Sequence, residues 1–358
     1  GPIFTLQERL GIAFVTDVTL PGGGVERQSI SQYHVAPLGV GWYSDWSYNA
    51  DPDQPADTTL EYVQLIRVGD TRWPPNWAEV QAAAVQRPGS VWMIGNEPEC
   101  PNQDAVTPAV YAQRYHEAYT RITGWDHTAE IAIGAIVEPT PLRLRWLEKV
   151  LQAYQDAYGR PMPVHIWNIH IQILPEGAPT ENGWDLRAGA GVPVGIDFQA
   201  EGLNPREYTL PDCANAEILK NMVLDFREWM NDHGQRDKAL IISEMGVLQP
   251  SIYLVEGGSE EERQKRGDRA VELFMSETFT WLKTAVDSEI GMPADENRLV
   301  QRWLWFSLNG SFWDEAQNPK GFNGNLYDYV SKKPTRFGIW FMSLQHEYGT
   351  LIPFVRKS

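Results

Sequence analysis

The sequence predicts an α/β protein, a (β/α)8 TIM barrel with long loops after its strands. Eight short apolar runs are spread over the 358 residues, and helical patterns lie between most of them. The runs are continuously apolar, which is typical of parallel strands buried on both faces. A chain of this length fits one α/β barrel, so we expect residues 1–358 to form a single domain. The expected strands are residues 11–17, 38–46, 62–68, 91–99, 130–137, 164–174, 239–245 and 302–308.

Helix start signals follow several of these strands. Thr107-Pro108 and Thr140-Pro141 each place an N-cap residue before a proline at the first helical position. Ser259 and Glu262 have the spacing of a capping box. The expected helices are residues 77–86, 107–122, 140–159, 214–233, 259–286 and 335–346.

Two stretches do not fit a plain barrel repeat. Residues 49–59, between the second and third strands, are rich in Asp and Pro and show no helical pattern. Either a helix is lost there or the first strands are misnumbered. The loop 175–213 is too long for a simple connection, so we expect it to lie over the barrel mouth as a lid or a cleft wall.

Composition excludes several classes of partner. The formal net charge is −17, which argues against nucleic acid and against anionic membrane surfaces. The sequence contains no apolar run of the length that spans a membrane, about 18 residues or more. We therefore expect neither nucleic acid nor a membrane as a partner, and separately we expect a monomer.

Motifs for cofactors and metals are missing. The seven histidines form no HExxH or His-x-His motif, and Gly22-Gly23-Gly24 lacks the Lys-Ser/Thr of a phosphate loop. We expect no cofactor and no metal. Cys100 and Cys213 either form one disulfide or remain two free thiols. Gly1-Pro2 is typical of what a protease leaves after removing an expression tag, so the absence of a signal peptide here is uninformative. We expect a secreted, extracellular protein whose signal peptide was removed beforehand.

Two strands end in a carboxylate. The apolar run Val91–Ile94 leads into Gly-Asn-Glu-Pro-Glu, and Pro98 must end the strand because it has no backbone N–H. The run ALIISEMG at 239–246 delivers Glu244 in the same way. By our numbering these are strands four and seven. Catalytic groups of such barrels lie at the carboxyl ends of strands, so Glu97 and Glu244 are a candidate catalytic pair. The alternatives are ordinary ones, a helix-cap or ion-paired carboxylate at Glu97 and a buried ion pair at Glu244.

Asn96-Glu97-Pro98 on strand four and Ser243-Glu244 on strand seven resemble the glycoside hydrolases of clan GH-A, the 4/7 superfamily. The resemblance implies retaining hydrolysis through a covalent glycosyl-enzyme. It implies that Glu97 is the acid/base, that Glu244 is the nucleophile and that Asn96 hydrogen-bonds the sugar 2-hydroxyl.

A narrower likeness concerns the order of four motifs. The segment 41–46 (GWYSDW), the segment 95–99, Arg145-Trp146-Leu147 and His170 are similar in order to a barrel family of fungal and bacterial endo-β-1,3-glucanases. Those enzymes carry a tyrosine two residues after the matching histidine, where this chain has Gln172. Because Gln172 replaces this tyrosine, the sequence does not determine the substrate, but the predicted reaction class is unaffected.

Further candidates line the expected barrel mouth. Asn168, His170 and Gln172 share one strand face because side chains alternate along a strand, and this indicates a polar mouth; a hydrogen-bonded core histidine fits equally. Arg67 ends strand three and either contacts the site or forms an ordinary ion pair.

The chain contains 15 Trp, and indoles suit both a large core and a cleft that stacks on pyranose rings. We expect one or two of the tryptophans at strand ends or in loops to contact sugar, while core packing stays the alternative for each. The resemblance to clan GH-A implies an indole floor under the reacting sugar from strand eight, with Trp305 as the candidate and Trp303 as its competitor. The candidates are Trp42, Trp46, Trp184, Trp305 and Trp313.

Together these patterns predict a retaining, endo-acting β-glycoside hydrolase whose partner is an oligo- or polysaccharide, with a β-1,3-glucan as the candidate substrate. A carbohydrate-binding barrel without activity is one alternative, although such proteins have usually lost a carboxylate. A transglycosylase that uses the same carboxylate pair is the other.

Overall fold

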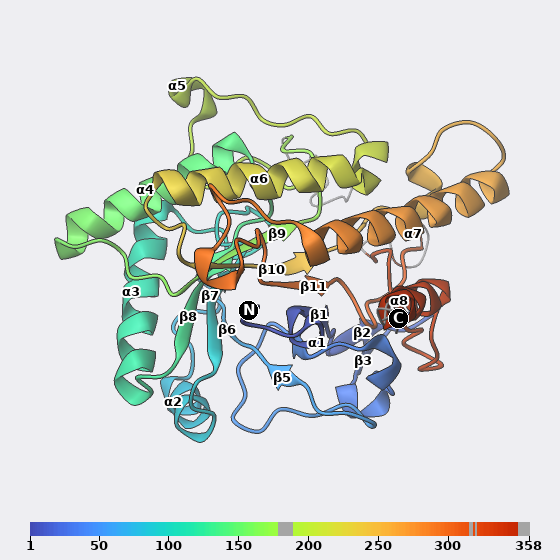
Figure 1. The fold of residues 1–358 in the computed structure, drawn as a ribbon, viewed down its shortest axis with the longest axis horizontal. Coiled ribbons are helices and arrows are strands. Elements are labelled where there is room, and N and C mark those ends of the chain that lie inside the picture. Colours follow the sequence, from blue (N-terminus) through green and yellow to red (C-terminus); the bar gives the residue numbers. More distant parts are fainter. Residues whose placement is uncertain (178–188, 315–317, 319–320, 350–358) are drawn as a thin grey trace, which may run out of the picture.

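The computed structural model describes residues 1–177, 189–314, 318 and 321–349, and a parallel sheet forms its centre (Figure 1). The strand order is β5-β4-β1-β11-β10-β9-β8-β7-β6. The first and last strands of this order, β5 (Glu61–Tyr62) and β6 (Gln64–Ile66), are separated in the chain only by Val63. The sheet therefore closes on itself as a barrel with flanking helices, and the predicted α/β TIM-barrel fold is confirmed.

The remaining barrel strands follow the predicted order, although most are shorter than predicted. β7 and β10 take the fourth and seventh places, because β5 and β6 together form the third. The bounds are β1 (Leu10–Ala13), β4 (Trp42–Ser44), β7 (Val91–Asn96), β8 (Glu130–Ala135), β9 (Ile166–Ile171), β10 (Ala239–Met245) and β11 (Arg302–Trp305).

Helices surround the barrel, with α6 and α7 crossing one side of it and α2 and α3 another (Figure 1). The predicted capping box of α7 is present, since the Ser259 side chain accepts from the Glu262 backbone N–H. Thr107 caps α3 through Val110 N–H, whereas the Thr140 side chain makes no cap and instead donates to Glu176. The bounds are α1 (Leu6–Arg9), α2 (Trp77–Gln86), α3 (Pro108–Trp125), α4 (Pro141–Tyr158), α5 (Phe198–Glu201), α6 (Ala216–Asp232), α7 (Glu260–Thr284) and α8 (Arg336–Gly349).

The structure decides between the two explanations for the Asp- and Pro-rich stretch. Residues 45–60, between β4 and β5, contain no helix, so a helix is lost there and the strand numbering holds. The predicted first strand ends early, because Asp17 belongs to a separate antiparallel hairpin of β2 (Asp17–Thr19) and β3 (Val25–Arg27).

Cys100 and Cys213 are both buried free thiols, so they form no disulfide.

Apolar side chains fill both faces of the barrel wall. Outside, residues such as Ile94, Ile133 and Ile169 pack against the helices. Inside, Trp42 and Met93 belong to a second cluster within the barrel. This double burial explains why the strands read as continuous apolar runs. Among the described residues, no helix is both long and apolar enough to cross a membrane.

Candidate active site

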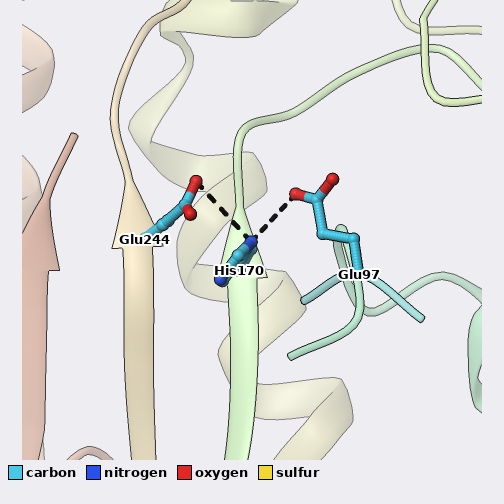
Figure 2. A group of neighbouring side chains, drawn as sticks. All are labelled: Glu97, His170 and Glu244. Carbon is cyan, nitrogen blue, oxygen red and sulfur yellow. Dashed lines mark hydrogen bonds and ion pairs between the residues drawn. The ribbon is translucent and has the colours of Figure 1, made fainter. Parts of the chain in front are cut away.

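Three ionisable side chains meet at the carboxyl ends of neighbouring strands (Figure 2). Glu97 follows β7, His170 lies near the end of β9, and Glu244 lies near the end of β10. One ligand atom from each of the three lies within 4.8 Å of the others. The structure thus brings the two sequence-predicted carboxylates together, with the predicted histidine between them.

The backbone turns sharply to present Glu97. Its φ of 43° lies in the left-handed region, where a residue other than glycine is uncommon and under strain. Its N–H donates to Ala135 O at 2.9 Å, which holds the turn against β8. Pro98, next in the chain, cannot extend the strand. The side chain is 12% exposed, so the carboxylate reaches the mouth of the barrel.

His170 connects the two carboxylates. Its Nδ1 lies 2.9 Å from Glu97 Oε1 and 3.7 Å from Glu244 Oε2, and its Nε2 lies 3.1 Å from Ser243 Oγ. Burial by itself lowers the pKa of this imidazole, but the charge of Glu244 and the hydrogen bond to Glu97 outweigh it and raise the pKa above its ordinary value. Nδ1 donates to Glu97 when that carboxyl is ionised and accepts from it when the carboxyl carries the proton.

Glu244 is held by two further donors. Trp46 Nε1 donates to its Oε1 at 2.6 Å, and Gln172 Nε2 donates to its Oε2 at 3.1 Å. Burial raises the pKa of Glu244, and the charge of Glu97 raises it further. His170, Trp46 and Gln172 oppose this rise because all three favour the carboxylate form.

These contacts give Gln172 a defined role. The resemblance to the glucanases left this position open because a tyrosine is expected there. The structure shows an amide N–H directed at Glu244, and a second donor from the loop after β4. Trp46 was predicted as a sugar contact alone; its hydrogen bond to Glu244 could not be seen from a residue 198 positions away in the chain.

A cavity of about 360 Å³ is lined by Glu97 and Glu244, whereas His170 lies outside its lining. Of the predicted substrate contacts, Asn96, Trp46, Arg67 and Gln172 line it. It also has an aromatic wall that includes Phe306 and Phe322 and an apolar side that includes Cys100, Val137, Leu174, Ala190 and Leu248. Ala190, which belongs to the loop 175–213, is one of the lining residues, and Leu174 directly precedes that loop.

Several predicted contacts lie elsewhere. Trp42 is 1% exposed inside the barrel, where its Nε1 donates to Arg9 O. Asn168 is fully buried below His170 and donates to Ile133 O at 3.2 Å. Trp313 is partly buried and packs edge-on against Tyr253 outside the cavity lining. Trp184 lies outside the described residues.

Trp305 does not provide a floor for the site. It is fully buried, its Nε1 donates to Gly324 O at 2.8 Å, and its ring packs against Phe274 and Phe279 of α7. Its competitor Trp303 is equally buried and also packs against Phe279. Both residues face outward, and the alternation places Phe306 on the inner face instead.

Phe306 is one cavity-lining residue that sequence reasoning missed. Its ring packs edge-on against Trp46 with centroids 5.7 Å apart, and both rings line the cavity. Side chains alternate along a strand, so Phe306 lies on the same face as Leu304, two residues before it. The sequence did not show which of the two faces is the inner one.

A buried ion-pair cluster supports the site from behind. Arg143, at the start of α4, pairs with Glu99 at 2.8 Å and with Glu176 at 2.6 Å, and all three side chains are fully buried. Arg143 Nη2 also donates to Gly191 O at 3.0 Å. This cluster joins the ends of β7 and β9 to the loop that carries Ala190. Glu99 is thus an ion-pair residue.

Glu97, His170 and Glu244 are also the residues that could hold a metal ion. Within the described ranges they form the one group of three possible ligands whose atoms lie close enough together. The sequence predicted no metal because no ligand motif is present. The absence of a metal therefore stays a prediction.

Comparison with known proteins points to carbohydrate chemistry. A family model described as glycosyl hydrolase catalytic core matches residues 14–176, a span that contains Glu97 and His170 and ends before Glu244. A sequence search of curated proteins finds no relative.

Solved structures of GH128 enzymes share the fold. An endo-β-1,3-glucanase of subgroup II from Sorangium cellulosum has a TM-score of 0.54 at 15% identity, covering 94% of this chain and 98% of its own. A subgroup I endo-β-1,3-glucanase from Amycolatopsis mediterranei, in complex with laminaritriose, has a TM-score of 0.53 at 15% identity, covering 94% and 99%. The family match supports a glycoside hydrolase, and the solved structures show the fold that this chain shares.

Proposed function

We propose that this protein is a retaining, endo-acting β-glycoside hydrolase that cleaves a neutral β-1,3-glucan by double displacement, as in clan GH-A. The observation that carries the proposal is the carboxylate pair at the barrel mouth. Oxygens of Glu97 and Glu244 lie within 4.8 Å of each other beside a cavity of about 360 Å³. Retaining glycosidases keep their carboxyl groups about 5–5.5 Å apart, whereas inverting enzymes need roughly 6.5–9.5 Å to admit a water.

The two carboxylates take different roles because their surroundings differ. Glu244 accepts from Trp46 and Gln172, one donor on each oxygen, and these donors stabilise the ionised form that a nucleophile needs. Glu97 is presented on a strained turn and its carboxyl contacts His170, which suits a group that exchanges protons with the leaving sugar and with water.

The reaction proceeds in two steps. A Glu244 oxygen attacks the anomeric carbon while the Glu97 carboxyl proton moves to the glycosidic oxygen, so that the C–O bond breaks and the leaving sugar departs. Glu97, now ionised, takes a proton from water as that water attacks the same carbon. The bond to Glu244 breaks, and both carboxyl groups return to their starting states.

The charges of the cavity favour a neutral glycan. Arg67 is the one cationic side chain among the described cavity-lining residues, and its Nε lies 2.6 Å from Asp104 Oδ1. The other charged residues of the lining are acidic, namely Asp17, Glu97 and Glu244. A polyanionic substrate would meet repulsion there. The aromatic pair Trp46 and Phe306 offers the apolar surface on which a pyranose ring stacks.

The linkage and endo action are supported by the GH128 endo-β-1,3-glucanases that share the fold. A GH128 exo-β-1,3-glucanase specific for curdlan, from Blastomyces gilchristii, also shares it, with a TM-score of 0.50 at 15% identity. The product pattern is therefore part of the test. A monomeric state and a secreted location stay predictions from the sequence.

The test combines a substrate panel with two variants. Wild-type protein is assayed on β-1,3-glucans, mannans, xylans and galactans, with NMR of the anomer that forms first. We expect oligosaccharides from β-1,3-glucan with net retention; an inverted first product would refute double displacement. Accumulation of longer oligosaccharides would indicate transglycosylation instead of hydrolysis.

The variants separate the two roles. Glu244→Gln should abolish turnover while the fold stays intact by circular dichroism, and retained activity would exclude it as the nucleophile. Glu97→Ala should lose most activity and regain part of it with azide, because a small anion can attack the glycosyl-enzyme without a general base. Failure of azide to restore any activity in a folded variant counts against the acid/base role.

A further inference from the structure

We propose that the end of the cavity beside the β2–β3 hairpin is a distal subsite, which binds a further neutral sugar of the glycan outside the catalytic centre. In this subsite Asp17 accepts from hydroxyls of the sugar, and Ser311 donates to it. The inference rests on the proposed function and deepens it, because it assigns a substrate contact to two residues without a predicted role. The sequence placed Asp17 only at the end of the first strand.

One cavity joins the catalytic carboxylates to the hairpin. Its lining includes Glu97 and Glu244, and it also includes Asp17 and Thr19 of β2. In the strand order only β11 separates β1, which the hairpin follows, from β10, which carries Glu244. The cavity therefore continues from the Glu244 side of the catalytic centre to the hairpin, and a glycan bound at the centre can extend along it.

The hairpin presents Asp17 and Thr19 on one face. Side chains alternate along a strand, and Val18 between them is fully buried on the other face. The Asp17 side chain is 57% exposed, and the nearest cation is Arg27 on the opposite strand, with Nη1 at 3.8 Å from Asp17 Oδ1. An exposed pair of this kind contributes little, so the carboxylate can accept from hydroxyls. Arg27 partly offsets its charge, which favours a neutral sugar over a cationic one.

The loop after β11 holds the hairpin in place. The fully buried Asn309 accepts from Val15 N–H through Oδ1 and donates to Val15 O through Nδ2, both at 2.8 Å. Ser311 Oγ accepts from Thr19 N–H at 2.7 Å. A hydroxyl that accepts still carries a proton to donate, and the half-buried Ser311 lines the cavity. The acceptor on Asp17 and the donor on Ser311 are thus positioned before a sugar binds, which lowers the entropy cost of binding.

An aromatic wall connects this end of the cavity to the catalytic centre. Phe306 packs edge-on against Trp46 with centroids 5.7 Å apart and edge-on against Phe322 with centroids 5.3 Å apart. All three rings line the cavity, and Phe322 N–H donates to Ser311 O at 3.0 Å. A pyranose has apolar C–H faces and a rim of hydroxyls. An apolar wall beside a carboxylate and a hydroxyl matches both parts of such a ring.

The activity test uses a series of β-1,3-linked gluco-oligosaccharides of increasing length. Asp17→Ala should lower kcat/KM about tenfold on the longest oligosaccharides, the size of one hydrogen bond to a charged group. It should leave kcat/KM unchanged on the shortest oligosaccharide that the wild type cleaves, because that substrate does not reach the hairpin. An equal loss on every length, or no loss on any, would overturn the inference.

Arg27→Ala is the matched control. It breaks the same exposed ion pair as Asp17→Ala but keeps the carboxylate. We expect wild-type activity on every length and, for both variants, an unchanged melting temperature, because both side chains are exposed. A loss in Arg27→Ala equal to that in Asp17→Ala would show that the ion pair matters and not a contact with sugar, and it would refute the subsite.

A binding measurement separates this inference from the proposed function. Calorimetric titration of Glu244→Gln with the same oligosaccharides gives Kd without turnover. Affinity should rise with chain length, and adding Asp17→Ala should remove most of that rise. Affinities that do not depend on Asp17, or no binding at all, would overturn the subsite. A wild-type protein that cleaves no glycan of the panel refutes the proposed function, while titration of Glu244→Gln with the same glycans still decides the subsite.

Discussion

Replacing Trp46 by phenylalanine removes one hydrogen bond to the proposed nucleophile and little else. The indole N–H lies 2.6 Å from Glu244 Oε1, the shortest contact to that carboxylate in the described part of the chain. Phenylalanine keeps an aromatic ring that can pack edge-on against Phe306, as the indole does. Trp46 has a φ of 61°, and the change adds no branch at Cβ, so backbone strain stays the same.

The magnitude follows from the type of bond. A hydrogen bond to a charged group contributes about 1.5–3 kcal/mol, more than a neutral one. If the reaction needs that stabilisation to hold Glu244 ionised and aligned, kcat/KM falls about 10- to 150-fold. The hydrogen bond also lowers the pKa of Glu244, so its loss raises that pKa. The acid limb of the pH profile therefore moves to higher pH.

The assay is kcat/KM on a soluble β-1,3-glucan across pH, with the melting temperature as a control for folding. Trp313→Phe is the matched control, since Trp313 lies outside the cavity lining. A Trp46→Phe profile that keeps its rate and its acid limb would show that the hydrogen bond does not act on the nucleophile. A limb that moves to lower pH would refute the electrostatic reasoning.

The remaining predictions concern the buried cluster and the possible metal. Arg143→Met leaves Glu99 and Glu176 buried without their cation, so the free energy of unfolding should fall by about 3–5 kcal/mol in urea; a loss under about 1 kcal/mol would contradict the buried pairing. Burial raises the pKa of Glu138 to about 8 from 4.5, so folding takes up a proton between these values and stability falls as pH rises through this window. Glu138→Gln should weaken that dependence, and an unchanged slope in urea titrations at several pH values would exclude Glu138 as its source. Activity should survive dialysis against a chelator, because no proposed step needs a cation; a loss that a divalent ion restores would instead make Glu97, His170 and Glu244 a metal site.

The order of the strands and helices could be predicted from local sequence signals. Proline after a threonine, the Ser259–Glu262 spacing and the apolar runs are local signals, and each depends on residues a few positions apart. Glu97 and Glu244 could be assigned to strands four and seven for this reason. The split of the third strand into β5 and β6 left no local signal, since only Val63 separates them.

The face of each aromatic residue was not encoded in the same way. A half-buried strand alternates between apolar and polar residues, so its buried face can be read. Here both faces are buried, and Trp303, Trp305 and Phe306 all look alike in the sequence. Only barrel closure decides that the two tryptophans pack against α7 while Phe306 enters the cavity.

The amino-acid sequence by itself determined the barrel, the place of its two carboxylates and the polar face that carries His170 and Gln172. The tertiary structure decided which groups surround them. Trp46 reaches Glu244, and Arg67 reaches Asn96 through Gln103. These contacts join strand ends that are distant in the chain, and hydrogen bonds of this kind depend on positions in space that no local pattern specifies.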